Sequence, residues 1–269
     1  MLGKLLKHEW NATMKVLLPA NVVIVLLTVL GRIMLGLNIF ETDSEIVQMI
    51  AVLCLILYIL SLFAVCIACT IYIAVRFYKT VYTDEGYLLH TLPVTSTEII
   101  WSKMMIGALW NLITSIVISV SVLLLVFGSL SPGSFGEMMN ELSKLISTYL
   151  GSVFTGWVVF TVFLSVLSCF YSTLWLFAAI SFGQLISKHK VLGSFIGYAI
   201  GYIVAQIVAT VAMTANGLTN QAMLLDESVD AVITYVNTTF GISFVITLVF
   251  TVLYYFVTSY MMKRRLNLD

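Results

Sequence analysis

The stretch VQMIAVLCLILYILSLFAVCIACTIYIAVRF occupies residues 47–77 and decides the class of the fold. Its one charged side chain is Arg76, next to its end. An α-helix needs about 20 apolar residues to cross a hydrocarbon core about 30 Å thick. At 1.5 Å per residue, a helix of about 31 residues reaches about 46 Å. The stretch therefore predicts a membrane-spanning helix that projects beyond the bilayer into the cytoplasm.

The rest of the chain has the same character. Hydrophobic residues make up 61% of its 269 residues and charged residues only 10%, whereas soluble domains have about 25% charged residues. We predict an all-α integral membrane protein, in which an amphipathic helix at 1–16 precedes a six-helix transmembrane domain at 17–269. The six spans are expected at 17–37, 47–77, 96–128, 147–180, 193–213 and 237–261.

The distribution of basic side chains predicts the orientation of these spans. The outer side and its margin hold only Arg32 and Lys144. Cytoplasmic loops carry the excess of Lys and Arg, so both termini are predicted to be cytoplasmic. The other 11 of the 13 basic residues then face the cytoplasm: Lys4, Lys7, Lys15, Arg76, Lys79, Lys103, Lys188, Lys190, Lys263, Arg264 and Arg265.

Residues 2–15 have the pattern of an amphipathic helix rather than of a span. The apolar face would carry Trp10, which we expect at the level of the lipid headgroups. Pro19 then falls near the start of the first span, where proline is tolerated. The apolar residues at helical spacing are Leu2, Leu5, Leu6, Trp10 and Met14, and the opposite face holds Lys4, Lys7, His8, Asn11 and Lys15.

The stretch RFYKTVYTDEGYLLHTLPVTSTEIIWSK, residues 76–103, is the most polar long segment and joins two long spans. Thr83 can cap a short helix whose first turn holds Asp84 and Glu85, both favourable at the positive end of a helix. Pro93 disfavours helical geometry at the residue before it, so this helix should end at Leu92. The sequence thus predicts a short cytoplasmic helix held between two rigid stems.

A second helix is predicted to begin directly afterwards. Thr95 and Glu98 have the spacing of a capping box, and Val94 and Ile99 have that of a hydrophobic staple. From the residues alone, two interpretations of the connection stay open. It is either an ordinary structured loop resting on the membrane or an element that docks on another protein.

The chain lacks the motifs of the common enzyme classes. It has no GxxxxGK[ST] phosphate-binding loop, no HExxH and no GxSxG, so we expect it not to be an enzyme by itself and to hold no cofactor. Within the predicted spans the one Asp, Glu or His is Glu98, the third residue of the span 96–128 and so at its end. The interior of the spans holds none, which argues against an ion-driven carrier. The cysteines lie in apolar runs and are expected as small core residues; they are Cys54, Cys66, Cys69 and Cys169.

A stripe of small residues at intervals of four marks the predicted fifth span. Such a stripe lets another helix approach closely, either within one subunit or across a subunit interface. Outside the membrane, Ser134 and Glu137 have capping-box spacing and predict an interfacial helix that leads into the fourth span. The stripe comprises Gly193, Gly197, Gly201, Ala205 and Ala209.

Two segments resemble a known family. The connection at 76–103 and the segment AAISFGQLISKHKVLGSFIGY at 178–198 are similar to segments of Firmicute permeases from ATP-binding-cassette (ABC) exporters of the ABC-type-2 family. With the amphipathic helix and six spans, the resemblance covers nearly the whole chain. It implies a permease of the bacterial cell membrane that pairs with a second permease subunit, as a homodimer or a heterodimer. It also implies that each permease binds a separate ATPase subunit, which holds ATP and Mg.

The resemblance also implies roles for particular residues. Residues 1–16 would be the family's connecting helix, and the short helix at 84–92 would be the coupling helix that docks in a groove of the ATPase. Its residues are Asp84, Glu85, Gly86, Tyr87, Leu88, Leu89, His90 and Leu92. In the family the second and fifth spans line the cargo cavity at the dimer axis. That would place Tyr58, Phe63 and Tyr72 along the cavity, and Gly193, Gly197, Gly201 and Ala205 at helix packing or the dimer interface.

Three functions remain open at this point. Among relatives, the sequence looks most like permeases that export cytolytic or antimicrobial peptides, such as the phenol-soluble-modulin exporters. A cavity without charges suits amphipathic peptides, but drugs or lipids are alternative cargoes. A membrane scaffold or sensor subunit that transports nothing could bind a partner through the same connection, and an ATP-independent channel or carrier is the third possibility. The chain has no basic arm that would suggest a nucleic-acid partner.

Overall fold

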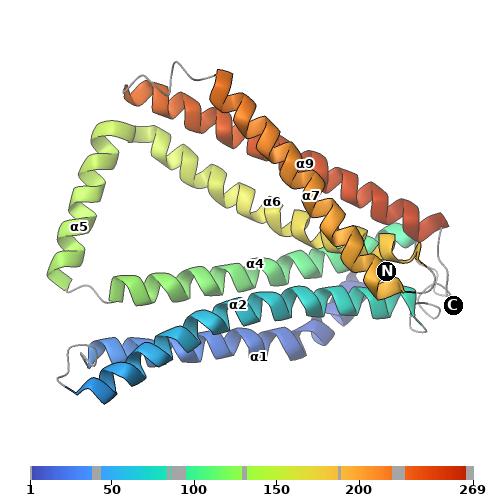
Figure 1. Ribbon diagram of the computed structural model, residues 1–269, viewed down its shortest axis with the longest axis horizontal. Helices are drawn as coiled ribbons and strands as arrows, with labels where there is room; N and C mark the ends of the chain where they lie inside the picture. Colours follow the sequence, from blue (N-terminus) through green and yellow to red (C-terminus); the bar gives the residue numbers. More distant parts are fainter. Residues whose placement is uncertain are drawn as a thin grey trace. The chain divides into compact units, whose positions relative to one another are not determined.

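The computed structural model describes residues 2–37, 44–83, 86, 95–128, 132–186, 189–219 and 228–264 (Figure 1). Every regular element within these ranges is helical. In chain order the elements are α1 (Leu2–Gly36), α2 (Glu45–Tyr82), α4 (Ser96–Gly128), α5 (Pro132–Leu145), the π-helix η2 (Ile146–Leu150), α6 (Gly151–Gly183), α7 (Lys190–Thr219) and α9 (Val229–Arg264).

Within the described residues, six helical runs are long and apolar enough to cross a membrane, which equals the number of spans that the sequence predicts. The fourth run reaches back from α6 through η2 into α5. Helices α7 and α9 extend beyond the predicted spans 193–213 and 237–261 by several residues at their ends. The described chain is therefore an all-helical protein of the multi-pass membrane class.

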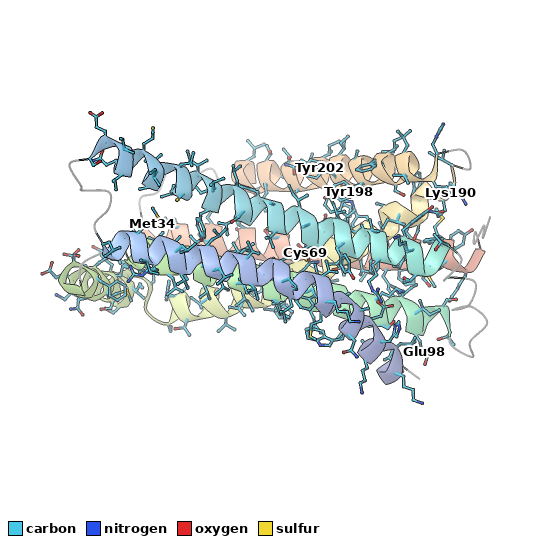
Figure 2. The ribbon with its side chains drawn as sticks, turned by 90° about the horizontal axis from the view of Figure 1, so that it is seen from below. Met34, Cys69, Glu98, Lys190, Tyr198 and Tyr202 are labelled. Carbon is cyan, nitrogen blue, oxygen red and sulfur yellow. The ribbon has the colours of Figure 1, made fainter. Side chains whose placement is uncertain are left out.

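Helix α1 departs from the prediction of a separate helix at the N-terminus. It runs without a break from Leu2 to Gly36 and contains Pro19 in its interior. Proline removes one backbone hydrogen bond and bends a helix, and Figure 2 shows α1 bending in its N-terminal half. The helix continues because its packed face continues: Thr13 and Leu17, before the proline, are buried like Asn21 and Ile24 after it.

The chain divides into two compact units, each with its own core. We call Gly3–Ile73 with Leu109–Trp157 the N-terminal unit, and Met1–Leu2, Ala74–Ala108 and Val158–Asp269 the C-terminal unit. Helices α2, α4 and α6 each pass from one unit into the other.

In the N-terminal unit α1 lies alongside α2 and α4 (Figure 1). A helix was predicted before the fourth span, and α5 lies there; it begins at Pro132, so Ser134 lies in its first turn. Proline suits this first position because its missing N–H needs no partner there. An edge-to-face contact between Phe127 and Phe135, with ring centroids 5.4 Å apart, joins the end of α4 to α5.

The C-terminal unit contains α7 and α9, which run side by side in Figure 1, together with most of α6. Its most deeply buried side chains lie near the end of α2, the start of α4 and the end of α6. The end of α2 and the start of α4 flank, along the chain, the connection that the sequence singled out.

Candidate functional site

The connection between α2 and α4 is described at its two ends and at Gly86. The Gly86 N–H donates to the carbonyl of Thr83, 2.7 Å away. The Thr83 hydroxyl donates to the carbonyl of Lys79, one turn earlier in α2. The predicted coupling helix otherwise lies outside the described residues; these are Asp84, Glu85, Tyr87, Leu88, Leu89, His90 and Leu92.

The capping box at the start of α4 is confirmed. The Thr95 backbone N–H donates to Glu98 Oε2 over 3.0 Å, and the Glu98 N–H donates to Thr95 Oγ1 over 3.3 Å. Figure 2 labels Glu98 on the first turn of the helix. Two backbone donors that the helix itself leaves unpaired are thereby satisfied. Helix α4 consequently begins at a defined residue directly after the connection.

The stems of the connection are tightly packed against α6. The rings of Phe77 and Phe177 stack with centroids 3.8 Å apart and planes 9° apart, and the two side chains are 2% and 1% exposed. One turn further along α2, the buried Tyr82 hydroxyl donates to Ser181 Oγ over 2.8 Å. Stacked aromatic rings contribute about 0.5–1.5 kcal/mol beyond their buried area. The end of α2 is thus held against α6 by both apolar and polar contacts.

Lys103 joins the second stem to the first. This side chain, which the sequence placed among the cytoplasmic basic residues, is only 6% exposed, and its Nζ donates to the hydroxyl of Thr80 on α2. Ile99 and Ile100 beside it are buried completely or nearly so. The end of α2, the start of α4 and the end of α6 therefore pack together. We call these three packed helix ends the mounting of the α2–α4 connection.

The glycines of the predicted small-residue stripe face α6 of the same chain. A Cβ added to Gly193 would lie 2.8 Å from the Gly183 carbonyl oxygen, and one on Gly197 would lie 3.1 Å from the Ala179 carbonyl oxygen. A Cβ on Gly201 would lie 2.7 Å from Trp175 Nε1. These separations are shorter than normal carbon contacts, so the close approach of α6 and α7 requires glycine at all three positions. Ala205, the next member, is partly exposed.

The three aromatic residues proposed for a cavity do not share one environment. Tyr58 is buried and its hydroxyl pairs with that of Ser121 on α4. The Tyr72 hydroxyl donates to the Ala12 carbonyl on α1 over 3.1 Å. Phe63 is 65% exposed. Two of the three residues thus serve helix contacts within the N-terminal unit.

The N-terminal unit also contains a ladder of polar contacts between α1 and α4 that the sequence reasoning missed. Trp110 Nε1 donates to Thr13 Oγ1 over 2.8 Å, and this hydrogen bond is the first of the ladder in chain order along both helices. The ladder continues with Asn21 Nδ2 donating to Thr114 Oγ1 over 3.2 Å and with the hydroxyls of Thr28 and Ser121, 2.6 Å apart.

Further contacts extend this ladder at both ends. The rings of Trp10 and Trp110 stack at 5.1 Å, so Trp10 lies against α4. At the other end, the Arg32 guanidinium donates to the carbonyl of Gly128, the last residue of α4. The pairs progress in the same direction along both helices, so α1 and α4 are parallel. The spacing of Thr13, Asn21 and Thr28 by seven or eight residues was the available signal.

No described residues form a metal site. Among the residues placed in the structure, no three His, Cys, Asp or Glu side chains cluster as metal ligands would. The four cysteines are free thiols; Cys69 is buried and Cys54 and Cys66 are exposed on α2.

No protein-family description, curated protein or solved structure matches this chain. The mounting around the α2–α4 connection is therefore interpreted from its own geometry and from the family resemblance of the sequence.

Proposed function

We propose that this protein is the permease subunit of an ATP-driven exporter of the ABC-type-2 family. The observation that carries the proposal is the mounting of the α2–α4 connection. A segment that transmits force from a partner needs a rigid base, and here the stacked Phe77 and Phe177, the Tyr82–Ser181 hydrogen bond and the Lys103–Thr80 hydrogen bond supply one. An ordinary surface loop needs no such base.

In this proposal residues 84–92 form the coupling helix that docks on the ATPase. The capping box of Thr95 and Glu98 starts α4 immediately after it. Displacement of the short helix would then move the ends of α2, α4 and α6 together, because these three ends are packed as one body. The packing supports this role, and the family resemblance of residues 76–103 suggests the partner.

The energy source is a separate subunit. The chain contains no phosphate-binding loop, so ATP and Mg would be bound by the ATPase. A second permease subunit, identical or different, would complete the complex. We place the protein in the bacterial cell membrane with both termini in the cytoplasm, which agrees with the even number of candidate spans and the bias of Lys and Arg.

The proposed cargo is an amphipathic peptide of the cytolytic or antimicrobial kind, with hydrophobic drugs or lipids as the second candidate. Helices α6 and α7 carry a single charged residue, Lys190, at the very start of α7. A highly charged sugar phosphate would lose its hydration there at a cost of several kcal/mol per ion. An amphipathic molecule can bury its apolar face at no such cost.

Co-purification with a candidate ATPase tests the proposal. We expect Glu85→Arg to abolish recovery of the ATPase, whereas the matched charge reversal Glu141→Arg on α5 leaves recovery unchanged. We further expect amphipathic peptides to raise the rate of ATP hydrolysis by the purified complex. Recovery of ATPase at wild-type yield with Glu85→Arg, or stimulation by polyanionic sugars alone, would contradict the proposal.

A further inference from the structure

Five aromatic side chains from three helices of the C-terminal unit form a cluster that we call the aromatic patch. At its centre the Trp175 indole on α6 stacks on Tyr198 of α7, with centroids 4.1 Å apart and planes 12° apart. It also stacks on Tyr202, at 6.0 Å and 18°. Tyr171 contacts Trp175 at 6.1 Å and Tyr254 of α9 at 5.8 Å.

The two tyrosines of α7 are the open side of the patch. Tyr198 is 36% exposed and Tyr202 is 54% exposed, and Figure 2 shows both on α7. They lie one turn apart, so they present neighbouring rings along the same side of the helix. Within the described part of the chain, neither hydroxyl has a hydrogen-bond partner, and the buried Trp175 Nε1 has none either.

The exposure of these two tyrosines is informative because of how far along α7, and so how deep in a membrane, they would lie. Tyr202 lies 12 residues after Lys190, the first residue of α7, which corresponds to about 18 Å along the helix axis. Half the thickness of a hydrocarbon core is about 15 Å. Tyrosines at the membrane interface reach water with their hydroxyls, but Tyr202 is too deep for that. Packing explains the stack, but not an exposed, unpaired hydroxyl near the middle of a span.

We propose that the aromatic patch lines a water-accessible path and receives cationic side chains, ammonium or guanidinium, of an amphipathic cargo. The negative face of an aromatic ring attracts a cation, and the free phenol oxygens of Tyr198 and Tyr202 can accept hydrogen bonds from it. Helices α6 and α7 contain no carboxylate, so the ring faces and phenol oxygens are what these two helices offer a cation. An anion would meet only weak donors there.

Several aromatic ring faces in a row suit a cargo that must be released again during transport. A buried carboxylate would hold a cation tightly and would itself be costly to keep ionised in lipid. Cation–π contacts are individually weaker, so a lysine side chain could bind at Tyr198 and transfer to Tyr202 one turn deeper. The inference rests on the proposed export function for its biological meaning, but its test requires neither the ATPase nor the cargo.

The test measures thiol modification at Tyr202→Cys in the full-length chain with its four native cysteines replaced. Unsealed membranes are treated with two impermeant methanethiosulfonates, one carrying a quaternary ammonium and one a sulfonate. The rate ratio is normalised to that of Ser134→Cys on the outer helix α5. We expect the cationic reagent to be favoured by about fivefold, the scale of a cation–π contact.

Two second-site variants show whether the indole is responsible. Trp175→Leu should bring the normalised ratio close to that of the reference, whereas Trp175→Phe, which keeps a ring face, should preserve most of the preference. Phe163→Leu is the matched control, because Phe163 is an exposed aromatic residue on the same helix but contacts Phe244 instead of the patch. It should leave the ratio unchanged.

Three results would overturn the inference. Failure of both reagents to modify Tyr202→Cys, while Ser134→Cys reacts, would show that the patch faces lipid or protein. Equal normalised rates would show a path without cation preference, and a preference for the sulfonate would show the opposite selectivity. None of these results bears on whether an ATPase binds at the α2–α4 connection, so the two proposals fail separately.

Discussion

Several hydroxyl and amide side chains in the predicted spans join helices, whereas many others bond to a carbonyl one turn earlier in their own helix. The hydroxyls of Thr28 and Ser121 lie 2.6 Å apart between α1 and α4, and Ser121 also pairs with Tyr58 of α2. Lipid offers no hydrogen bonds, so a polar group in a span needs a partner within the protein. At this scale the chain behaves as a set of specific polar contacts embedded in an apolar background.

The Thr28–Ser121 contact leads to a quantitative prediction. In a double-mutant cycle, Thr28→Ala and Ser121→Ala should show a coupling free energy of about 0.6 kcal/mol, the average for such contacts between spanning helices. Unfolding in mixed micelles under increasing denaturing detergent would measure it. Thr13→Ala with Ser121→Ala is the control pair and should be additive, because Thr13 bonds to Trp110 instead. A coupling near zero for the first pair would show that the hydroxyls do not interact.

Among the elements, the α6–α7 pair depends on four glycines. Gly183 on α6 and Gly193 on α7 approach so closely that a side chain on either would meet the other helix's backbone. Gly197 and Gly201 extend the contact along α7. Small residues allow such approach and favour van der Waals packing, which drives helix association in membranes. The same contact brings Trp175 of α6 onto the tyrosines of α7.

Replacing Gly201 by leucine should therefore destabilise the protein. The new side chain would collide with the Trp175 indole, and overpacking of this kind typically costs 1–3 kcal/mol. Thermal unfolding in detergent, followed by loss of the monodisperse species, would measure the effect. Gly217→Leu is the matched control on the same helix, since a Cβ at Gly217 has no neighbour within 4 Å. Equal stability of both variants would mean that α6 and α7 do not pack through this glycine.

For the whole molecule, orientation in the membrane is the property on which the functional proposal depends. The six candidate spans of the described residues would place the two ends of the chain on the same side, and the bias of Lys and Arg favours the cytoplasm for that side. The α2–α4 connection and the α6–α7 turn would then face the cytoplasm together with the termini. Helix α5 would lie on the outer side, where no ATPase can reach it.

Labelling of single cysteines tests this orientation. In a background without native cysteines, Lys144→Cys should react with an impermeant maleimide in intact cells, and Lys188→Cys should react only after the membrane is permeabilised. Lys144 belongs to α5, and Lys188 lies between α6 and α7. The reverse pattern would place the α2–α4 connection outside the cell and would remove the basis for an ATPase partner.

The six candidate spans of the described residues, helix α5 and the start of α4 were predictable from the sequence. Each of these depends on local information. A long apolar run must cross the bilayer whatever its neighbours are, and the capping box of Thr95 and Glu98 satisfies its backbone donors within four residues. The absence of a phosphate-binding loop is likewise visible in the sequence alone.

Only the tertiary structure decided which faces of the helices meet. Periodicity showed that Trp10 shares a face with other apolar residues of α1, but the buried face centres on Glu9 and Thr13 and binds α4. The tertiary structure also placed the glycines of α7 against α6 and Tyr58 against Ser121. The physical reason is the solvent. In water an apolar face must turn inward, whereas lipid accepts an apolar face as readily as a neighbouring helix does, so hydrophobicity cannot select the contact and shape and hydrogen bonding must.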